Sequence, residues 1–434
     1  MKTPGAASAP TDAARRRAIR AWCWYDWANS AFATSVSVAI LPPFFASVAK
    51  GEGLAANVAT AYWGYACAAG LLIAAFGGPI LGSLADHLGA RKRILFCCVV
   101  VGALMTAVIG LVPWAGWRGL LALFGVAFIA YAMANVLYDS LLPTVTGPEQ
   151  VHRVSARGFA YGYIGGGILL ALNLAWIMRP AMFHLASADF ATRLSFVSVA
   201  VWWLGFSIPL FRDVPEPPPV HEPIPANKLM QAVLGQIWQT LLSLRRQPEL
   251  FRFLIAFWLY SDGIGTVIKM STIYGSELGI GTGSLIGALL MVQILAAPAS
   301  IVFGRIGQRY DPRLAVAIGL GGYVVITMIG YFLSKPWHFW LLAGLVAMFQ
   351  GGTQALSRSM FSRLVPRRQQ GEMFGFYSVS EKLAGVVGPI LFGVVAQLTG
   401  SGRLAVLTLL PFFIIGAWLL MTVDLEKGAE RAGN

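Results

Sequence analysis

Seven charged side chains lie inside long apolar stretches of this 434-residue sequence. They are Asp26, Asp139, Asp262, Lys269, Arg358, Glu381 and Lys382. A charge at the centre of a membrane helix costs about 2.5–3.5 kcal/mol on insertion scales, so such groups persist where they face a wet cavity or pair with one another. A cavity that carries both signs of charge suits a zwitterionic or anionic solute. The chemistry indicated is solute binding and proton transfer.

Two sets of functional residues follow from these positions. The residues expected to face the cavity combine charges and amides: Asp26, Asn29, Asn135, Asp262, Lys269, Gln354 and Lys382. Gln293 and Gln350 are further candidate hydrogen-bonding groups, and packing between helices stays open for every amide. All five histidines lie in loops or at the ends of apolar segments. If transport is coupled to protons, the carriers are therefore the carboxylates: Asp26, Asp139, Asp262 and Glu381.

Spacing orders some of these charges. Asp262 and Lys269 are two turns apart on one helical face, which favours a shared exposure to the cavity. Glu381 and Lys382 are neighbours and diverge by about 100° on a helix, and we interpret Lys382 as the one that faces the cavity. Asp139 and the oppositely charged Arg358 occupy equivalent places in the two halves of the chain. Two alternatives remain for Asp139 and Arg358: a structural ion pair and a cytoplasmic gate.

No catalytic, metal or cofactor site is indicated. The sequence holds no G-x-S-x-G, H-E-x-x-H or cysteine–histidine arrangement, so we do not expect an enzyme. The net charge of +13 raises the question of nucleic acid. The basic residues fall in short clusters between apolar segments, however, as the positive-inside rule expects. We predict a small-molecule substrate and membrane lipid as partners, no nucleic acid, and a monomer.

The composition requires a membrane protein. It is 57% hydrophobic and 12% charged, about half the charged fraction of a soluble domain. Roughly 20 apolar residues span the hydrocarbon core as a helix, the form that satisfies the backbone in lipid. Twelve such segments can be drawn. They run over 22–49, 56–85, 93–112, 118–145, 155–179, 193–211, 250–275, 283–304, 313–334, 338–362, 373–398 and 402–423.

Lysines and arginines orient these twelve segments. With the N-terminus in the cytoplasm, most of the 32 basic residues fall in cytoplasmic segments. The other side holds Lys50, Arg118, Arg179, Arg193, Lys335 and Arg403. This asymmetry predicts that both termini are cytoplasmic. The expected location is the bacterial inner membrane, as an integral multi-pass protein.

A polar linker divides the segments into two sets of six. Residues 212–228 are proline-rich and cannot span a membrane. Apolar residues at helical spacing follow up to Leu244 and predict an amphipathic helix on the cytoplasmic leaflet. The predicted organisation is a cytoplasmic tail (1–21), a six-helix bundle (22–211), the linker with its interfacial helix (212–249), a second six-helix bundle (250–424) and a cytoplasmic tail (425–434).

The loop after the second segment carries a recognisable pattern. It reads Gly82-Ser-Leu-Ala-Asp86-His-Leu-Gly89-Ala-Arg91-Lys92-Arg93. Glycines permit a tight turn and close helix approach, Asp86 can meet the N-terminal end of a neighbouring helix, and the basic run can bind the anionic leaflet. With Asp139 and Arg358, the residues Gly82, Asp86, Gly89, Arg91 and Lys92 form the predicted gating set. The loop resembles the signature loop of the major facilitator superfamily.

Longer motifs narrow the resemblance. The stretches 25–32 (YDWANSAF), 157–163 (RGFAYGY), 351–359 (GGTQALSRS) and 371–377 (GEMFGFY) are similar to signatures of the vacuole-effluxer-like branch of that superfamily. Met373 and Glu381 depart from the branch's usual residues. The resemblance implies an all-α major facilitator fold of two pseudo-symmetric six-helix bundles, and secondary active transport by alternating access.

The founding members of the branch are autophagy-linked vacuolar amino-acid exporters. The resemblance therefore implies a small polar solute, with an amino acid leaving the cytoplasm as one candidate. A sugar, a peptide or a drug remains an alternative solute. A non-transporting membrane receptor or assembly protein is a further alternative, which large extramembrane domains would favour.

Overall fold

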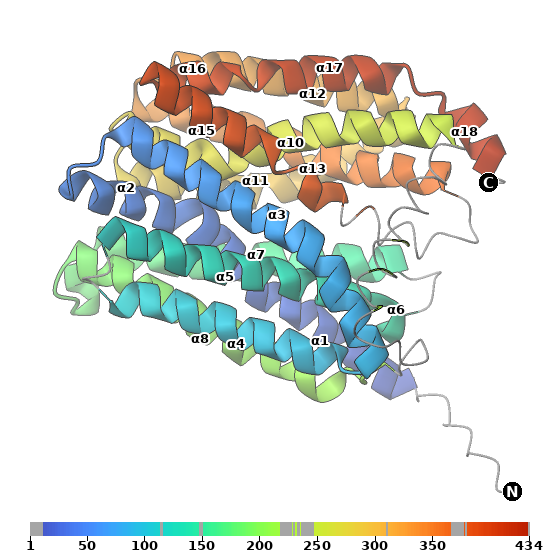
Figure 1. Cartoon of the computed structure of the whole chain (residues 1–434), viewed down its shortest axis with the longest axis horizontal. Helices are drawn as coiled ribbons and strands as arrows, with labels where there is room; N and C mark the ends of the chain where they lie inside the picture. Colours follow the sequence, from blue (N-terminus) through green and yellow to red (C-terminus); the bar gives the residue numbers. More distant parts are fainter. Residues whose placement is uncertain are drawn as a thin grey trace, which may run out of the picture.

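The computed structural model of the chain describes residues 12–112, 116–146, 151–217, 228, 231, 235, 247–309, 311–365, 377 and 380–432. Across these residues the secondary structure is helical, with short turns between helices (Figure 1). Within the described part of the chain, eleven helices are long and apolar enough to span a membrane. In the twelfth, α11, the apolar portion Thr282–Ala296 is shorter. The predicted all-α membrane fold agrees with this arrangement.

The helices divide into two halves. The N-terminal half contains α1 (Asp12–Ala31), η1 (Phe32–Ile40), α2 (Leu41–Gly51), α3 (Ala56–Leu88), α4 (Arg91–Leu111), α5 (Gly116–Ser140), α6 (Leu142–Val145), α7 (Val151–Met178), η2 (Pro180–Phe183) and α8 (Ala188–Asp213). The C-terminal half contains α10 (Pro248–Glu277), α11 (Thr282–Arg309), α12 (Pro312–Tyr331), α13 (Pro336–Leu364), α15 (Val387–Thr399), α16 (Gly402–Leu407), α17 (Leu410–Met421) and α18 (Leu425–Ala432).

Short local signals start and end these helices. Pro248, Pro312 and Pro336 occupy the first helical position, where a missing N–H costs nothing. At the start of α8 the hydroxyl of Ser187 accepts a hydrogen bond from the Phe190 amide at 3.1 Å. Gly89 ends α3 with a φ of 55°, a left-handed conformation that glycine adopts without strain.

The two halves pack against each other in a symmetric way. The second long helix of each half contacts the fifth of the other, so that α3 lies against α15 and α11 lies against α7. Exchanging the halves exchanges these two contacts, as expected of an internal structural repeat. In Figure 1 the N-terminal half lies below and the C-terminal half above, with both termini at the same end.

We call that end the terminal face. It carries the starts of α1, α10 and α12 and the end of α8. The opposite face carries the turns around 52–55, 184–187, 278–281 and 399–401.

Helix boundaries differ from the predicted segments at a few places. The first span begins at Asp12 and is continuous to Gly51, so the last ten residues of the predicted tail 1–21 are helical. The predicted span 373–398 is interrupted, because residues 384–386 form a turn before α15. The last span is divided between α16 and α17 at residues 408–409. Most of the predicted interfacial helix, and residues 373–376, lie outside the described residues.

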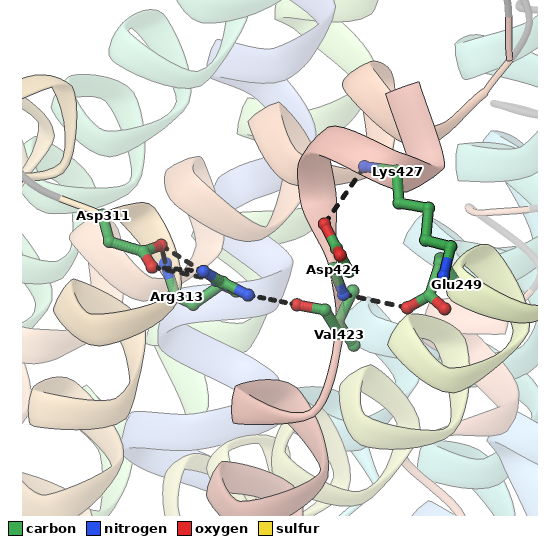
Figure 2. A network of polar contacts seen from close by, with 6 residues as sticks. All are labelled: Glu249, Asp311, Arg313, Val423, Asp424 and Lys427. Atoms are coloured by element: carbon green, nitrogen blue, oxygen red, sulfur yellow. Dashed lines mark hydrogen bonds and ion pairs between the residues drawn. The ribbon is translucent and has the colours of Figure 1, made fainter. Parts of the chain in front are cut away.

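A network of polar contacts fastens the C-terminal segment at the terminal face (Figure 2). Arg313 binds both oxygens of Asp311 and donates to the Val423 carbonyl. One residue further on, the Asp424 amide donates to Glu249 Oε2 at 2.8 Å. Helix α18, the predicted cytoplasmic tail, is therefore tied to the starts of α10 and α12.

Candidate functional site

A cavity of about 310 Å³ lies between the two halves. The N-terminal half contributes α1, η1 and α7, and the C-terminal half contributes α10 to α13, α15 and α16. The polar lining residues are Ser30, Thr34, Tyr163, Thr266, Ser271, Tyr274, Gln293, Thr327 and Gln350. The other described lining residues are apolar or glycine, and no formal charge is present among them. This cavity is therefore the candidate solute site.

The helical segment beside the cavity is a π-helix, and two prolines that follow it in the sequence explain why. Pro42 and Pro43 have no N–H, so the carbonyl of Val38 can find neither the fourth nor the fifth residue onward as a donor. The nine residues from Phe32 to Ile40 form a π-helix immediately before these prolines. The Thr272 hydroxyl of α10 donates to the Val38 carbonyl at 2.5 Å. A backbone group freed in one half is thus satisfied by the other half.

Hydrogen bonds between the halves continue toward the opposite face. Thr60 of α3 donates to Glu277 of α10 at 2.6 Å, and the second oxygen of Glu277 accepts from the Gly402 amide at 2.8 Å. Beside them, Asn57 donates to the Ala396 carbonyl and the Tyr65 hydroxyl donates to Gln397. We call these contacts, with Thr272–Val38, the interhalf seal. These contacts hold the two halves together on the side of the cavity that faces the opposite face.

Close backbone approach supports the seal at one glycine. A Cβ atom built on Gly64 of α3 would lie 2.7 Å from the Pro389 carbonyl oxygen of α15. Any larger residue would push these two helices apart. The absence of a side chain at this position is therefore what allows α3 and α15 to meet.

Asp262 lies one helical turn from the cavity, because it precedes the lining residue Thr266 by four positions. It is 3% exposed. Its Oδ2 accepts from the Gly388 amide at 2.9 Å, while Oδ1 has no hydrogen-bond partner in the described part of the chain. Helix α15 begins at Val387 without a side-chain cap of its own. The Asp262 carboxylate therefore caps α15 from a neighbouring helix, in the favourable place for a negative charge.

Two amides predicted to face the solute instead bind each other. Asn29 of α1 donates to Asn135 of α5 at 2.6 Å. Asp26, three residues earlier in the chain, is half-buried against α7, where a Cβ atom built on Gly158 would lie 2.6 Å from Asp26 Oδ2. These residues join the helices of the N-terminal half.

The remaining predicted site residues lie at several depths. Lys269 is half-buried and donates weakly to the Gly265 carbonyl at 3.4 Å. Lys382 is half-buried, whereas Gln354, Glu381 and Asp139 are exposed. The Arg358 guanidinium of α13 lies 5.0 Å from the ring centre of Phe159 of α7, which is a cation–π distance. Since Phe159 lines the cavity, Arg358 connects the halves at the cavity's edge.

The signature loop makes specific contacts. Arg91 donates to the Ser140 carbonyl at 3.3 Å, and the Lys92 amide donates to Glu216 at 2.8 Å. The Lys92 ammonium also donates to the Val214 carbonyl. These bonds tie the loop to the ends of α5 and α8, a role beyond the predicted lipid contact. A Cβ atom on Gly82 would meet nothing within 4 Å, so close helix approach does not explain Gly82. The Asp86 side chain lies outside the described residues.

The described lining of the cavity is therefore uncharged, whereas the sequence predicted charged residues there. No residue of the predicted cavity set is among the described lining residues, because Asp262 is engaged by Gly388 and Asn29 by Asn135. The functional roles of that set stay predictions. Sequence reasoning missed the hydroxyls of Ser30, Thr34 and Thr266. A usable signal was present on α10, where Thr266, Met270 and Tyr274 repeat every four residues on the face of Asp262.

Two six-helix halves around a shared cavity define a transporter of the major facilitator type. Solved structures support this fold. A bacterial homologue of the human lysosomal transporter Spinster, in an inward-facing and occupied conformation, aligns with a TM-score of 0.68 at 13% identity, covering 98% of this chain and 99% of that chain. A D-xylose–proton symporter aligns with a TM-score of 0.66 at 14% identity, covering 95% and 98%.

Sequence comparison identifies the family. Residues 57–433 match the family described as "Vacuole effluxer Atg22 like", and the chain belongs to it. An uncharacterized MFS-type transporter, YxiO of Bacillus subtilis (strain 168), is 40% identical over 413 residues, covering 94% of this chain and 95% of the relative. Autophagy-related protein 22 of Yarrowia lipolytica is 29% identical over 310 residues, 64% of this chain. The chain spans about half of that longer relative, 51%. The predicted family and fold are confirmed.

Proposed function

We propose that this chain is a secondary active transporter that carries a small polar solute by alternating access. The observation behind the proposal is the cavity, which draws its lining from both halves and is bounded on one side by the interhalf seal. Rocking one half against the other would break the seal and open the cavity to the opposite face. The solute would then be exposed to each side in turn.

The proposed direction is export from the cytoplasm. The terminal face lies in the cytoplasm of a bacterial cell, with the chain a monomer in the inner membrane. The basic residues of the loops support this orientation, and the family description "effluxer" supports outward movement. Amino acids are the first solutes to test, because the family's founding exporters carry them. An interhalf seal that opens and closes permits transport in either direction. The solute gradient therefore determines the direction of net flux.

Proton coupling belongs to the same proposal. The candidate carriers are Asp26, Asp139, Asp262 and Glu381. Asp262 is the strongest of these, since it is buried, has one oxygen without a partner among the described residues and caps a helix that contacts α3 across the halves. Protonation would remove the charge that holds the start of α15. A proton could thereby change the packing of α15 against α3.

A counterflow assay tests the transport proposal. Purified protein in liposomes preloaded with unlabelled amino acids should accumulate the labelled solute transiently, provided that the solute is a substrate. Val346→Trp fills the cavity and should abolish counterflow. The matched control is Val201→Trp on α8, where the side chain is 67% exposed and has room. Equal activity of the two variants would contradict the cavity as the transport site.

A further inference from the structure

Most hydroxyls in the cavity are already committed to the protein. Thr34, Thr266 and Thr327 each donate to a backbone carbonyl one turn earlier in their own helices. Ser271 donates to the Ile268 carbonyl, and the Tyr274 hydroxyl donates across to the Gly330 carbonyl. Each hydroxyl has one proton to donate. These five groups can therefore accept from a solute but have no donor left for it.

Among the described lining residues, the hydroxyls of Ser30 and Tyr163 and the amides of two glutamines are not committed in this way. The amides of Gln293 on α11 and Gln350 on α13 line the cavity. Neither side chain makes a hydrogen bond with another described residue. Each primary amide offers two donors and a carbonyl acceptor. Helices α11 and α13 pack directly against each other in the C-terminal half, so this half presents both amides to the cavity. They form a neutral recognition pair for a carbonyl, amide or hydroxyl group.

The rest of the lining favours an apolar body. Aliphatic and aromatic residues form the walls, with Val38 and Phe159 from the N-terminal half and Leu289, Val292 and Phe339 among those from the C-terminal half. Burying apolar solute surface against such walls is favourable by about 25 cal/mol per Å². A compact apolar group on the solute would therefore supply much of the binding energy.

A charge on the solute would meet no opposite charge among the described lining residues. The nearest charges along α10 are not among the described lining residues, and each has a contact within the protein: Asp262 accepts from the Gly388 amide, and Lys269 donates weakly to the Gly265 carbonyl. Transfer of an ion from water into a site without a counter-charge is strongly unfavourable. The cavity should therefore discriminate against ionised solutes.

We infer that the cavity takes an uncharged amphipathic solute, with an apolar body and a carbonyl, amide or hydroxyl group bound by Gln293 and Gln350. The inference rests on the proposed transport function for the movement of the solute, and it replaces amino acids with an uncharged class as the preferred solute. Binding itself can be tested separately. A solute with no net charge but with two separated ionised groups, such as an amino-acid zwitterion, is excluded from the preferred class.

Four compounds with the same apolar body separate these classes. At about pH 6, phenylalanine is a zwitterion, N-acetylphenylalanine an anion and phenylalaninamide a cation, while N-acetylphenylalaninamide is uncharged. Binding is measured by thermal shift of the purified protein, since a ligand of the folded state stabilises it by mass action. The uncharged compound should bind at least about tenfold more tightly than each ionised one.

Variants assign the recognition to the glutamines. Gln293→Leu and Gln350→Leu should each weaken binding of N-acetylphenylalaninamide several-fold. Gln231→Leu is the matched control, because Gln231 is exposed and is not among the residues that line the cavity. Gln350→Glu introduces a charge with little change of shape, and should move the preference toward the cation phenylalaninamide. A purely structural role for Gln350 would not produce that change of preference.

The outcomes separate the inference from the transport proposal. Binding of phenylalanine or N-acetylphenylalanine as tight as that of the uncharged compound would overturn the inference. Failure of all four compounds to stabilise the protein would overturn it as well. If N-acetylphenylalaninamide binds as expected but shows no counterflow in liposomes, the inference stands and the transport proposal fails.

Discussion

At the scale of single residues, Asp262 caps a helix and is also a candidate proton carrier. One carboxylate oxygen holds the Gly388 amide, and the other has no partner in the described part of the chain. Removing the acceptor altogether, as in Asp262→Leu, leaves a buried N–H unpaired and should cost about 1–3 kcal/mol. An amide in the same place would keep the acceptor and lose the ability to ionise.

Asp262→Asn therefore tests proton coupling without removing the helix cap. We expect thermal stability close to that of the unmodified protein and preserved counterflow. Solute accumulation driven by an imposed pH gradient should fall to the level seen without a gradient. The comparison variant is Asp189→Asn, whose side chain is 62% exposed in a surface ion pair with Arg193. Gradient-driven accumulation by Asp262→Asn would exclude Asp262 as the carrier.

The ionisation of Asp311, at the terminal face, should make the stability of the folded protein depend on pH. Hydrogen bonds from the Arg313 side chain lower the pKa of Asp311 below its usual value. A carboxyl group whose pKa is lowered by folding adds stability above its ordinary pKa of about 3.9, and that stability is lost as the pH falls through the lowered value. At neutral pH the carboxylate also accepts from the Arg313 amide as the cap of α12.

Asp311→Ala should accordingly destabilise the protein by about 0.5–2 kcal/mol at pH 7, the usual cost of losing a helix cap. The difference between variant and unmodified protein should shrink as the pH is lowered below about 4, because the carboxyl group becomes protonated in both folded and unfolded chains. Thermal unfolding in detergent across this pH range measures it. A difference independent of pH would show that the Arg313 contact contributes nothing.

At the scale of elements, the π-helix η1 couples local winding to the other half of the molecule. Thr272→Val removes the donor to the Val38 carbonyl and should cost about 1 kcal/mol. In a Pro42→Ala background an amide N–H returns four residues after Val38, so the carbonyl regains an intrahelical donor. The same Thr272→Val change should then cost close to nothing.

This pair forms a double-mutant cycle. Reversible unfolding in mixed micelles should give a coupling energy of about 1 kcal/mol between positions 42 and 272. An equal cost of Thr272→Val in both backgrounds would mean that the prolines are not the reason for the interhalf bond.

Element positions were largely accessible from the sequence, whereas the site was not. The predicted segment 56–85 becomes α3 (Ala56–Leu88), because hydropathy reports directly which residues lie in lipid. The turn before α15 was not predicted, since its cap comes from Asp262, 126 residues away in sequence. The charges inside the spans indicated a charged cavity. Hydropathy cannot tell a charge that lines a cavity from one that caps a helix.

At the scale of the whole molecule, the account requires the two halves to move as opposing bodies. The seal between Thr60 and Glu277 joins them on the side of the opposite face, and the cavity lies between them. Loss of the seal should therefore open the opposite face and close the terminal face together. Transporters built from structural repeats alternate in this way.

Paired spin labels measure this motion directly. Positions 51 and 281 report across the opposite face and have open space for a label, as does position 82, which pairs with exposed Glu430 at the terminal face. The four native cysteines are replaced first, and a monodisperse protein confirms folding. With Thr60→Val and Glu277→Gln introduced, electron–electron resonance should show the 51–281 distance lengthening while the 82–430 distance shortens. Distances that stay fixed, or that lengthen together, would contradict alternating access in this protein.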